Sequence, residues 1–114
     1  MIAISDPVPQ LRRGVVEPCI LGLLSKEPMY GWQLADRLIT DGGIIGSIGT
    51  LYPVLTRLRE RGHVTTYEVP SENGPARRYY ELTPAGEQSL DQFRQGWAAF
   101  TASVVRCIEP GTDS

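Results

Sequence analysis

The chain has 114 residues, the size of a single domain, and a net charge of −2. Its hydrophobic content of 41% is sufficient for a core, although a chain this small buries only about two-thirds of its unfolded surface, so self-association would help it. The net charge argues against a protein that is basic throughout. The charge is uneven, however: residues 47–80 hold five arginines against three acids, and residues 81–114 hold two arginines against five acids. This distribution is compatible with one DNA-facing surface.

Several classes of protein lack support in the sequence. Cys19 and Cys107 form no Cys-x-x-Cys pair, so we expect no metal and no cofactor, and we interpret both as small buried hydrophobic residues, with a redox or bridging role as the alternative. The longest apolar run is far shorter than the ~20 residues of a membrane span, and no signal peptide is visible, which predicts a cytoplasmic protein without a membrane partner. An enzyme is the weakest interpretation, because the chain has one histidine, no recognisable nucleophile–base pair and no glycine-rich phosphate loop.

The first segments predict a flexible arm followed by a buried helix. Residues 1–10 contain two prolines and show no hydrophobic period, which indicates an N-terminal arm. Over residues 11–24 apolar residues occupy every face, which is typical of a helix buried on more than one side. Pro18 lies within this run, so we expect the first helical turn near Val16 or Glu17. The two buried sides imply a core on one side and a second layer or second subunit on the other.

Residues 30–39 predict a second, amphipathic helix, since their apolar residues recur at helical spacing. The stripe consists of Leu34, Ala35, Leu38 and Ile39. We expect the glycines at 42–43 to end this helix, and Ile44 and Ile45 in the linker to be tucked inward. Two short helices joined by a brief glycine-containing turn make a helix-turn-helix.

The third helix is expected within residues 48–62, and the rest of the chain is organised around it. Its stripe consists of Leu51, Val54, Leu55 and Leu58. Ser47 can cap its start and Gly62 its end. Pro53 should bend the helix if it falls in the second turn. The opposite side presents hydroxyls, an aromatic ring and an arginine, and such a face best suits a groove of DNA.

A β-hairpin is predicted next. Residues 63–69 are rich in β-branched side chains, residues 70–75 form a dense turn cluster, and residues 77–82 read as the returning strand. Tyr80 and Leu82 share one face of this strand, which we expect to be the core side.

The last helix is expected to start at Thr83 as N-cap, with Pro84 at its first position, and to run to about Ile108. Its apolar seam steps by three and four residues: Leu90, Phe93, Trp97, Phe100, Val104 and Cys107. We interpret the seam as a dimerisation arm, and the alternative is a helix that folds back on its own domain. Gly96 beside Trp97 would permit close approach.

These elements predict a mostly α fold with a small β-hairpin, namely a winged helix-turn-helix followed by a long C-terminal dimerisation helix. The expected organisation is an arm at residues 1–10, the winged helix-turn-helix at 11–82, the dimerisation helix at 83–108 and a tail at 109–114.

The sequence also resembles a known family, the PadR family of transcriptional regulators, over about residues 11–108. The matching motifs are Tyr30-Gly31-x-x-Leu34-Ala35, Gly49-Thr50-Leu51-Tyr52-Pro53-x-Leu55-x-Arg57-Leu58, Gly62-x-Val64 and Ser71-x-x-Gly74-Pro75-x-Arg77-x-Tyr79-Tyr80-x-Leu82-Thr83-x-x-Gly86. The short C-terminal region is similar to the compact subgroup with a single dimerising helix. His63, Trp32 and the linker at 42–46 depart from the family pattern.

The resemblance implies a homodimer that binds a near-palindromic operator in double-stranded DNA, usually as a repressor. Members of this family often release DNA when small aromatic or drug-like ligands bind between the subunits. The rival interpretation, supported by the net negative charge, is a winged-helix protein–protein interaction module that does not bind DNA alone.

The third helix carries most of the candidate DNA-binding residues. Tyr52, Thr56 and Arg57 face away from the apolar stripe, where they either contact base edges and phosphates or form an ordinary solvated face. Ser47 and Thr50 can donate to phosphates, cap the helix, or do both. Pro53 completes this set.

Tyr30 and the two wing arginines are further candidates for DNA contact. Tyr30 opens the second helix and either reaches the DNA backbone or lies at the core edge. Arg77 and Arg78 follow the hairpin tip and suit phosphate or minor-groove contacts. Neighbouring strand residues point to opposite faces, so we expect one arginine to reach DNA and the other to pair with an acid, and the sequence leaves open which one does so.

The aromatic seam of the last helix is the candidate effector site or dimer interface. The residues assigned to it are Cys19, Phe93, Trp97, Phe100 and Val104. Trp97 and its two phenylalanine neighbours either pack apolar surface between subunits or form a wall on which a flat aromatic ligand stacks.

Overall fold

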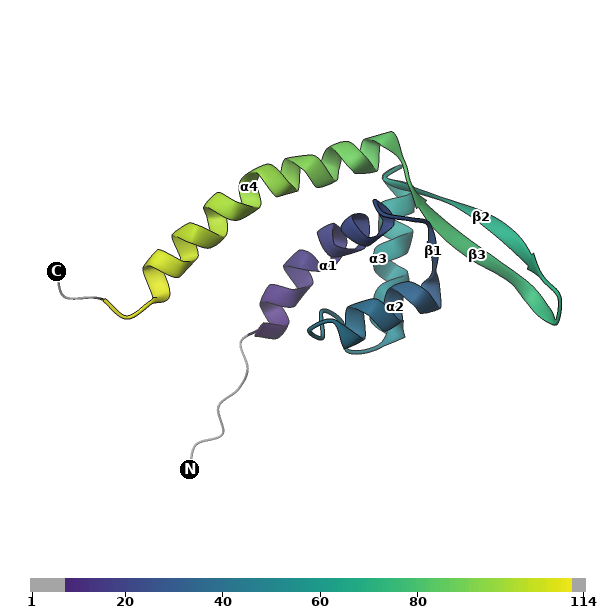
Figure 1. Ribbon diagram of the computed structural model, residues 1–114, viewed down its shortest axis with the longest axis horizontal. Coiled ribbons are helices and arrows are strands. Elements are labelled where there is room, and N and C mark those ends of the chain that lie inside the picture. Colours follow the sequence, from purple (N-terminus) through teal and green to yellow (C-terminus); the bar gives the residue numbers. More distant parts are fainter. Residues whose placement is uncertain (1–7, 112–114) are drawn as a thin grey trace, which may run out of the picture.

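The computed structural model describes residues 8–111, which form a mostly helical fold with one small antiparallel sheet. Figure 1 shows α4 running across the top of the molecule, α1 beneath it, and the hairpin of β2 and β3 projecting from the opposite end. The elements are α1 (Val8–Leu24), β1 (Met29–Tyr30), α2 (Gly31–Thr40), α3 (Ile48–Glu60), β2 (Val64–Ser71), β3 (Gly74–Leu82) and α4 (Pro84–Ile108). The predicted winged helix-turn-helix with a long final helix is confirmed.

Helix α1 begins much earlier than predicted. It starts at Val8 rather than near Val16 or Glu17, so part of the expected arm is helical, and residues 1–7 lie outside the described residues. Pro18 consequently sits inside the helix, where it removes one backbone hydrogen bond at a cost of about 3 kcal/mol. The helix tolerates this cost because Val16 and its other inward residues are buried in the core.

The core lies where α1, α2 and α3 meet. The predicted stripe of α3 is buried throughout, and Leu34 and Leu38 of α2 are buried against it. Ile45 is buried and Ile44 half-buried, as predicted, and their N–H groups both donate to the Leu38 carbonyl, at 2.8 Å for Ile44 and 3.4 Å for Ile45. Ile39, which we expected in the stripe of α2, is exposed instead, since it lies at the edge of the buried face.

The two ends of α3 are closed in different ways. Gly62 adopts a positive φ of 77°, its N–H donates to the Arg59 carbonyl at 3.0 Å, and the His63 N–H donates to Leu58 at 2.9 Å. This pairing satisfies the last carbonyls and confirms the glycine cap. Ser47 occupies the N-cap position, but its hydroxyl makes no capping hydrogen bond. Because α3 begins at Ile48, Pro53 falls in the second turn.

The wing is longer than the sequence predicts and has a third strand. Ser71 pairs with Gly74, so the turn contains only residues 72–73 rather than the whole cluster at 70–75. Pro70 is accommodated because β2 is an edge strand and its register shifts between Val69 and Ser71. Strand β1 was not predicted; it pairs with β3 and gives the sheet order β1-β3-β2.

The predicted core face of the hairpin is confirmed. Tyr80 is buried, and Leu82 is partly buried against the core. These two residues of β3 therefore attach the base of the wing to the helices, while the tip projects into solvent.

The start of α4 is joined tightly to the end of α3. The Thr83 hydroxyl accepts from the Gly86 N–H at 3.0 Å and donates to the Gly62 carbonyl at 2.6 Å. The Thr83 N–H donates to the His63 carbonyl at 3.1 Å. A Cβ atom at Gly86 would collide with that same His63 carbonyl oxygen. The predicted cap is confirmed, and it also connects two helices.

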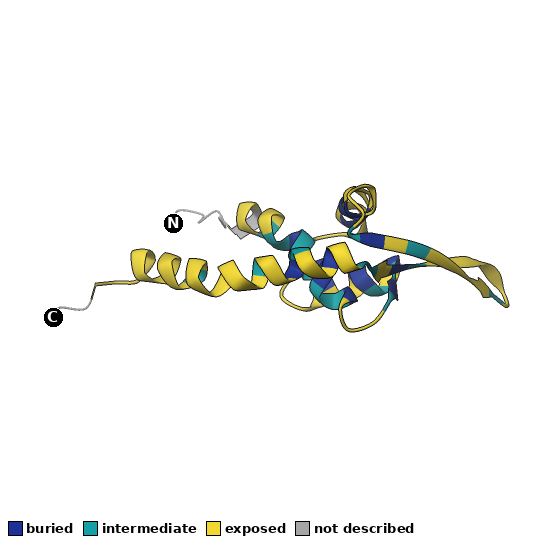
Figure 2. Ribbon diagram, turned by 90° about the horizontal axis from the view of Figure 1, so that it is seen from above, coloured by how far each residue is buried: buried dark blue, intermediate teal, exposed yellow. Residues whose placement is uncertain are grey.

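The exposure of α4 changes along its length, as Figure 2 shows. Leu90 is 3% exposed and packs in the core, whereas Phe100 is 62% exposed and Trp97 40% exposed. At ~1.5 Å per residue a helix of 25 residues is about 37 Å long, and only its first part rests on the winged-helix body.

Candidate nucleic-acid interface

The middle of α3 presents two polar side chains on one exposed face. Tyr52 and Thr56 are one helical turn apart, and the Thr56 hydroxyl donates to the Tyr52 carbonyl at 3.0 Å. The Tyr52 ring passes close over the start of α2, where a Cβ at Gly31 would lie 2.9 Å from the tyrosine hydroxyl oxygen. Gly31 is therefore needed to let the ring lie there. Tyr52 is 47% exposed, so its side chain is accessible to a base edge or a phosphate.

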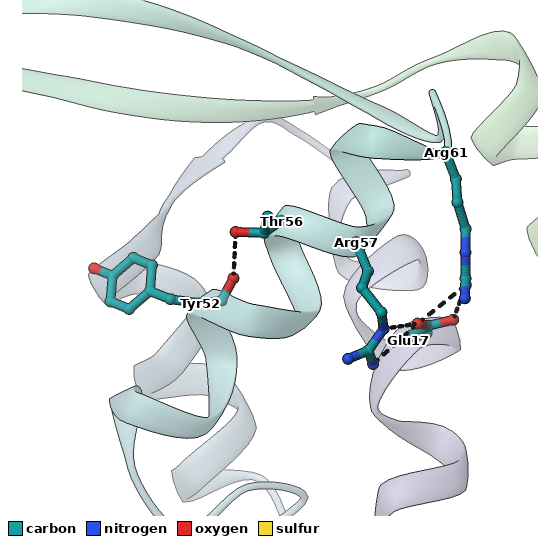
Figure 3. A network of polar contacts seen from close by, with 5 residues as sticks. All are labelled: Glu17, Tyr52, Thr56, Arg57 and Arg61. Carbon is teal, nitrogen blue, oxygen red and sulfur yellow. Dashed lines mark hydrogen bonds and ion pairs between the residues drawn. The ribbon is translucent and has the colours of Figure 1, made fainter.

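Arg57 lies on the other flank of the same helix and turns toward α1 (Figure 3). Its Nε donates to Oε1 of Glu17 at 3.2 Å, and its Nη2 lies 3.2 Å from the same oxygen. Arg61, one turn further on, places Nη1 3.0 Å from Oε2 of Glu17. One carboxylate of α1 thus holds two arginines of α3. Glu17 was not predicted as a site residue, because 40 residues separate it from Arg57 and its only signal is an acid within an apolar helix.

The two wing arginines have different partners. Arg78 stands directly opposite Glu68 in the sheet register, with its Nη2 3.6 Å from Oε1 of that acid. Arg77 points to the other face, and its guanidinium lies 4.8 Å from the centre of the Tyr30 ring. The structure therefore shows Arg78 as the arginine that pairs with an acid, and Arg77 resting on an aromatic ring that belongs to the start of α2.

A hollow of ≈ 510 Å³ lies between the start of α2, the exposed face of α3 and the wing. Its lining includes six residues that can contact a nucleic acid, Tyr30, Trp32, Tyr52, Thr56, Arg77 and Arg78, together with the acidic partner of Arg78, Glu68. Trp32 was not among the predicted contacts, and it is 60% exposed. Its signal was a large aromatic residue on the polar side of an amphipathic helix.

The remaining predicted DNA contacts lie elsewhere on α3. Ser47 and Thr50 are exposed at its N-terminal end, and Pro53 is exposed on the outward side. None of these three residues lines the hollow beside the wing. Ser47 and Thr50 belong to the start of the helix, where free N–H groups and the helix dipole favour an anion, whereas Pro53 lies in the second turn.

A second region, between α1 and α4, is apolar. A groove of ≈ 720 Å³ is lined by Val15 on one side and by Phe93, Trp97, Phe100 and Val104 on the other. The rings of Phe93 and Trp97 are stacked with their centroids 5.1 Å apart, and the Phe100 ring follows at 6.3 Å from that of Trp97. The structure thus brings four of the six predicted seam residues into one groove, whereas Leu90 is buried in the core and Cys107 does not line the groove.

An adjoining hollow of ≈ 520 Å³ shares Val15, Phe93 and Trp97 with this groove and reaches Cys19. Burial raises the pKa of the Cys19 thiol above its ordinary value. The thiol is therefore protonated at neutral pH and behaves as an apolar group. The other cysteine, Cys107, is exposed near the end of α4, so the prediction that both cysteines are buried is wrong for this residue.

Residues 8–111 offer neither a metal-binding cluster nor a membrane-spanning helix. No cluster of three or more histidine, cysteine, aspartate or glutamate side chains suits a metal ion in this part of the chain. No helix within the same residues is long and apolar enough to cross a bilayer.

Residues 20–92 match the model of the transcriptional regulator PadR-like family. This range starts within α1 and ends within α4, so it contains α2, α3 and the wing. Among characterised proteins, the transcriptional regulator Rv3488 of Mycobacterium tuberculosis is 32% identical over 96 residues, which is 84% of this chain and 88% of that protein.

Solved structures with the same fold include a PadR-like transcriptional regulator from Bacillus cereus, with a TM-score of 0.80 and 32% identity over 90% of this chain and 99% of that one. A PadR-like transcription factor from Bacteroides fragilis is 38% identical, with a TM-score of 0.73 and coverage of 90% and 99%. A PadR family regulator from Eggerthella lenta has a TM-score of 0.79 and 31% identity, with coverage of 91% and 90%.

Proposed function

Because the chain belongs to the PadR-like family of transcriptional regulators, we propose that it is a homodimeric, sequence-specific DNA-binding protein that represses transcription from a near-palindromic operator. In this proposal the protein acts by binding and is not an enzyme. The function requires access to the genome and therefore a cytoplasmic location. Residues 11–82 would serve as the DNA-binding body and residues 83–108 as the dimerisation helix.

The observation that carries the proposal is the continuous polar surface made by α3, the start of α2 and the wing. The major groove of B-DNA admits one α-helix, and Tyr52 and Thr56 stand on the side of α3 that would enter it. Arg77 lines the hollow beside this face and would meet the DNA backbone or minor groove. Ser47 and Thr50 would donate to phosphates at the helix start.

The dimer is proposed from the apolar surface that α1 and α4 leave open. Trp97, Phe100 and Val104 line one groove and are exposed in the single chain. Exposed aromatic and aliphatic residues in one continuous patch mark a contact surface. A second copy related by a two-fold axis would cover the patch on both chains at once and would place two α3 helices for two half-sites.

A small aromatic or drug-like molecule is the proposed effector. The stacked rings of Phe93 and Trp97 offer a flat apolar wall, and the adjoining hollow beside Cys19 adds room beneath it. A ligand held there would change the tilt of α4, and a shift of an ångström or two at the axis would be magnified at the wing tips. Phosphate contacts would then be lost and affinity for DNA would fall.

The test begins with selection of duplexes from a random library by the purified protein. We expect enrichment of one near-palindromic duplex, and its affinity should fall steeply as salt rises, since each phosphate contact releases counterions. Sedimentation should show two chains per enriched duplex. A protein–protein interaction module, the rival function, would enrich no duplex and would show only weak binding without sequence preference.

A further inference from the structure

Glu17 contacts only one edge of the Arg57 guanidinium. The arginine uses Nε and Nη2 against Oε1, each at 3.2 Å. A guanidinium is planar and carries five N–H groups, so a partner on the Nε–Nη2 edge leaves the Nη1–Nη2 end available as a second fork. Figure 3 shows the remaining terminal nitrogen of Arg57 pointing away from Glu17. The carboxylate therefore fixes the plane of the group without covering its end.

Glu17, which holds Arg57, lies on a part of α1 that is fixed by the core. Glu17 lies between Val16, which is buried, and the next buried residue of the same helix, Ile20. The carboxylate is less exposed than either arginine that it binds, at 28% against 50% for Arg57. Its position relative to α3 is therefore set by the packing of α1 against α3, and not by a mobile surface side chain.

Arg61 gives the cluster with Glu17 and Arg57 two positive charges against one negative charge. Its Nη1 lies 3.0 Å from Oε2 and 3.2 Å from Oε1 of Glu17, so two guanidiniums share one carboxylate. The cluster keeps one excess positive charge on the α1 side of α3. A simple surface pair would have neutralised Arg57 and would contribute little to stability. This cluster instead leaves Arg57 oriented and still attractive to an acceptor.

We propose that Glu17 is a positioning residue for DNA reading: it holds the Arg57 guanidinium so that its free end meets the paired acceptors of a base edge, of which guanine O6 and N7 are the best match. This proposal rests on the proposed function. Arginine loses side-chain entropy when it binds in one geometry, and a group already oriented loses less. Glu17 thus raises affinity for the correct duplex without touching DNA.

The test uses the full-length protein and the duplex that the wild type enriches from the random library, with a scrambled duplex of equal length beside it. Affinities are measured for the wild type, Glu17→Gln, Arg57→Ala and the double variant. Glu27→Gln is the matched control, because it removes the same charge from an exposed position beyond the end of α1. Thermal melting followed by circular dichroism verifies that each variant is folded.

We expect Glu17→Gln to weaken binding of the enriched duplex about 2- to 10-fold, the range for loss of one hydrogen-bonded orienting contact, and to leave the scrambled duplex unchanged. In the Arg57→Ala background the same substitution should have no further effect. The base pair that Arg57 contacts is the one whose replacement no longer weakens binding by Arg57→Ala. Replacing this base pair should also weaken binding by Glu17→Gln less than it weakens binding by the wild type. Glu27→Gln should behave as the wild type.

Two results would overturn the proposal while leaving the proposed function intact. Tighter binding of both duplexes by Glu17→Gln would show that the carboxylate competes with DNA for the arginines. An equal loss with and without Arg57 would show a merely structural role. If the wild-type protein enriches no duplex at all, the proposed function fails first, and the role of Glu17 fails with it.

Discussion

The two ends of α4 have the same seam pattern but different surroundings. Near the start, Leu90 is buried against α1 and the core, and Gly86 touches the end of α3. Beyond Trp97 the seam continues at the same spacing, yet its aromatic and aliphatic residues lie exposed along an open groove. The first half of the helix is buried by its own chain. The apolar face of the second half is not covered by any part of residues 8–111.

Hydrophobic spacing along a helix therefore indicates which face is buried, but not whether the same chain or a second chain covers that face. The pattern of α4 is that of a helix buried along its whole length, but the winged-helix body is only long enough to cover its first turns. A seam that outlasts its own domain is the pattern expected when a second chain supplies the missing surface.

The largest expected effect is a loss of stability from a substitution in the buried first half of α4. Leu90→Ala should lower the free energy of unfolding by about 2–5 kcal/mol, because it leaves a cavity in the core. The loss should be the same at low and high protein concentration in urea titrations. Phe100→Ala is the matched change in the open half, and its loss should appear only at concentrations where chains associate. Equal behaviour of the two variants would remove the distinction between the halves.

A charged residue in the exposed second half of α4 tests directly whether a second chain covers it. Phe100→Glu should raise the dissociation constant of the dimer by about 30-fold or more, the effect of losing at least 2 kcal/mol at an interface centre. Sedimentation equilibrium measures the shift. Gln95→Glu serves as control, because it adds the same charge on the side of α4 away from the seam. A wild-type chain that sediments as a monomer at micromolar concentration would contradict the interpretation of the seam.

Two glycines of α4 distinguish its buried start from its exposed half in the same way. Gly86→Ala should destabilise the protein by about 1–3 kcal/mol, since its methyl group would collide with the His63 carbonyl. Gly96→Ala meets nothing within 4 Å in the single chain, and it should raise helix stability by up to about 1 kcal/mol. Thermal melts at low protein concentration measure both. Loss of the dimer by Gly96→Ala alone would identify a close helix contact at that position.

The smallest effect concerns the thiol at the edge of the open groove. Because burial raises the pKa of Cys19, the thiolate is scarcer than in an unfolded chain at the same pH, and alkylation by iodoacetamide should be slower. The rate should rise as pH increases toward that raised pKa. Peptide mass spectrometry follows Cys19, with the urea-unfolded chain as reference. A rate in the folded protein equal to that of the unfolded chain would contradict the burial.

Much of the fold could be predicted because local signals and tertiary packing agree. The stripe of α3, the positive-φ glycine at Gly62 and the threonine cap at Thr83 each have a chemical signature within a few residues. Leu82 and Tyr80 were assigned correctly because a strand alternates with a period of two.

The errors have the opposite cause. Helix α1 extends through Pro18 because packing outweighs a local penalty, and β1 has only two residues, too few to show a period. Of the candidate site, the outward face of α3 could be predicted from periodicity. The partners of Arg57 could not, since the contact with Glu17 depends on how two helices cross. The choice between Arg77 and Arg78 likewise required the register that sets Arg78 opposite Glu68.

The joint between α3 and α4 limits the spacing of the DNA half-sites that the proposed dimer can bind. Thr83 is hydrogen-bonded to Gly62 and His63 on one side and to Gly86 on the other, so the two helices meet without a hinge. Regulators whose halves are connected by a slack tether can straddle sites at several separations. Two copies of this chain paired through α4 would instead hold their two α3 helices at one fixed separation, which matches a single distance along the duplex.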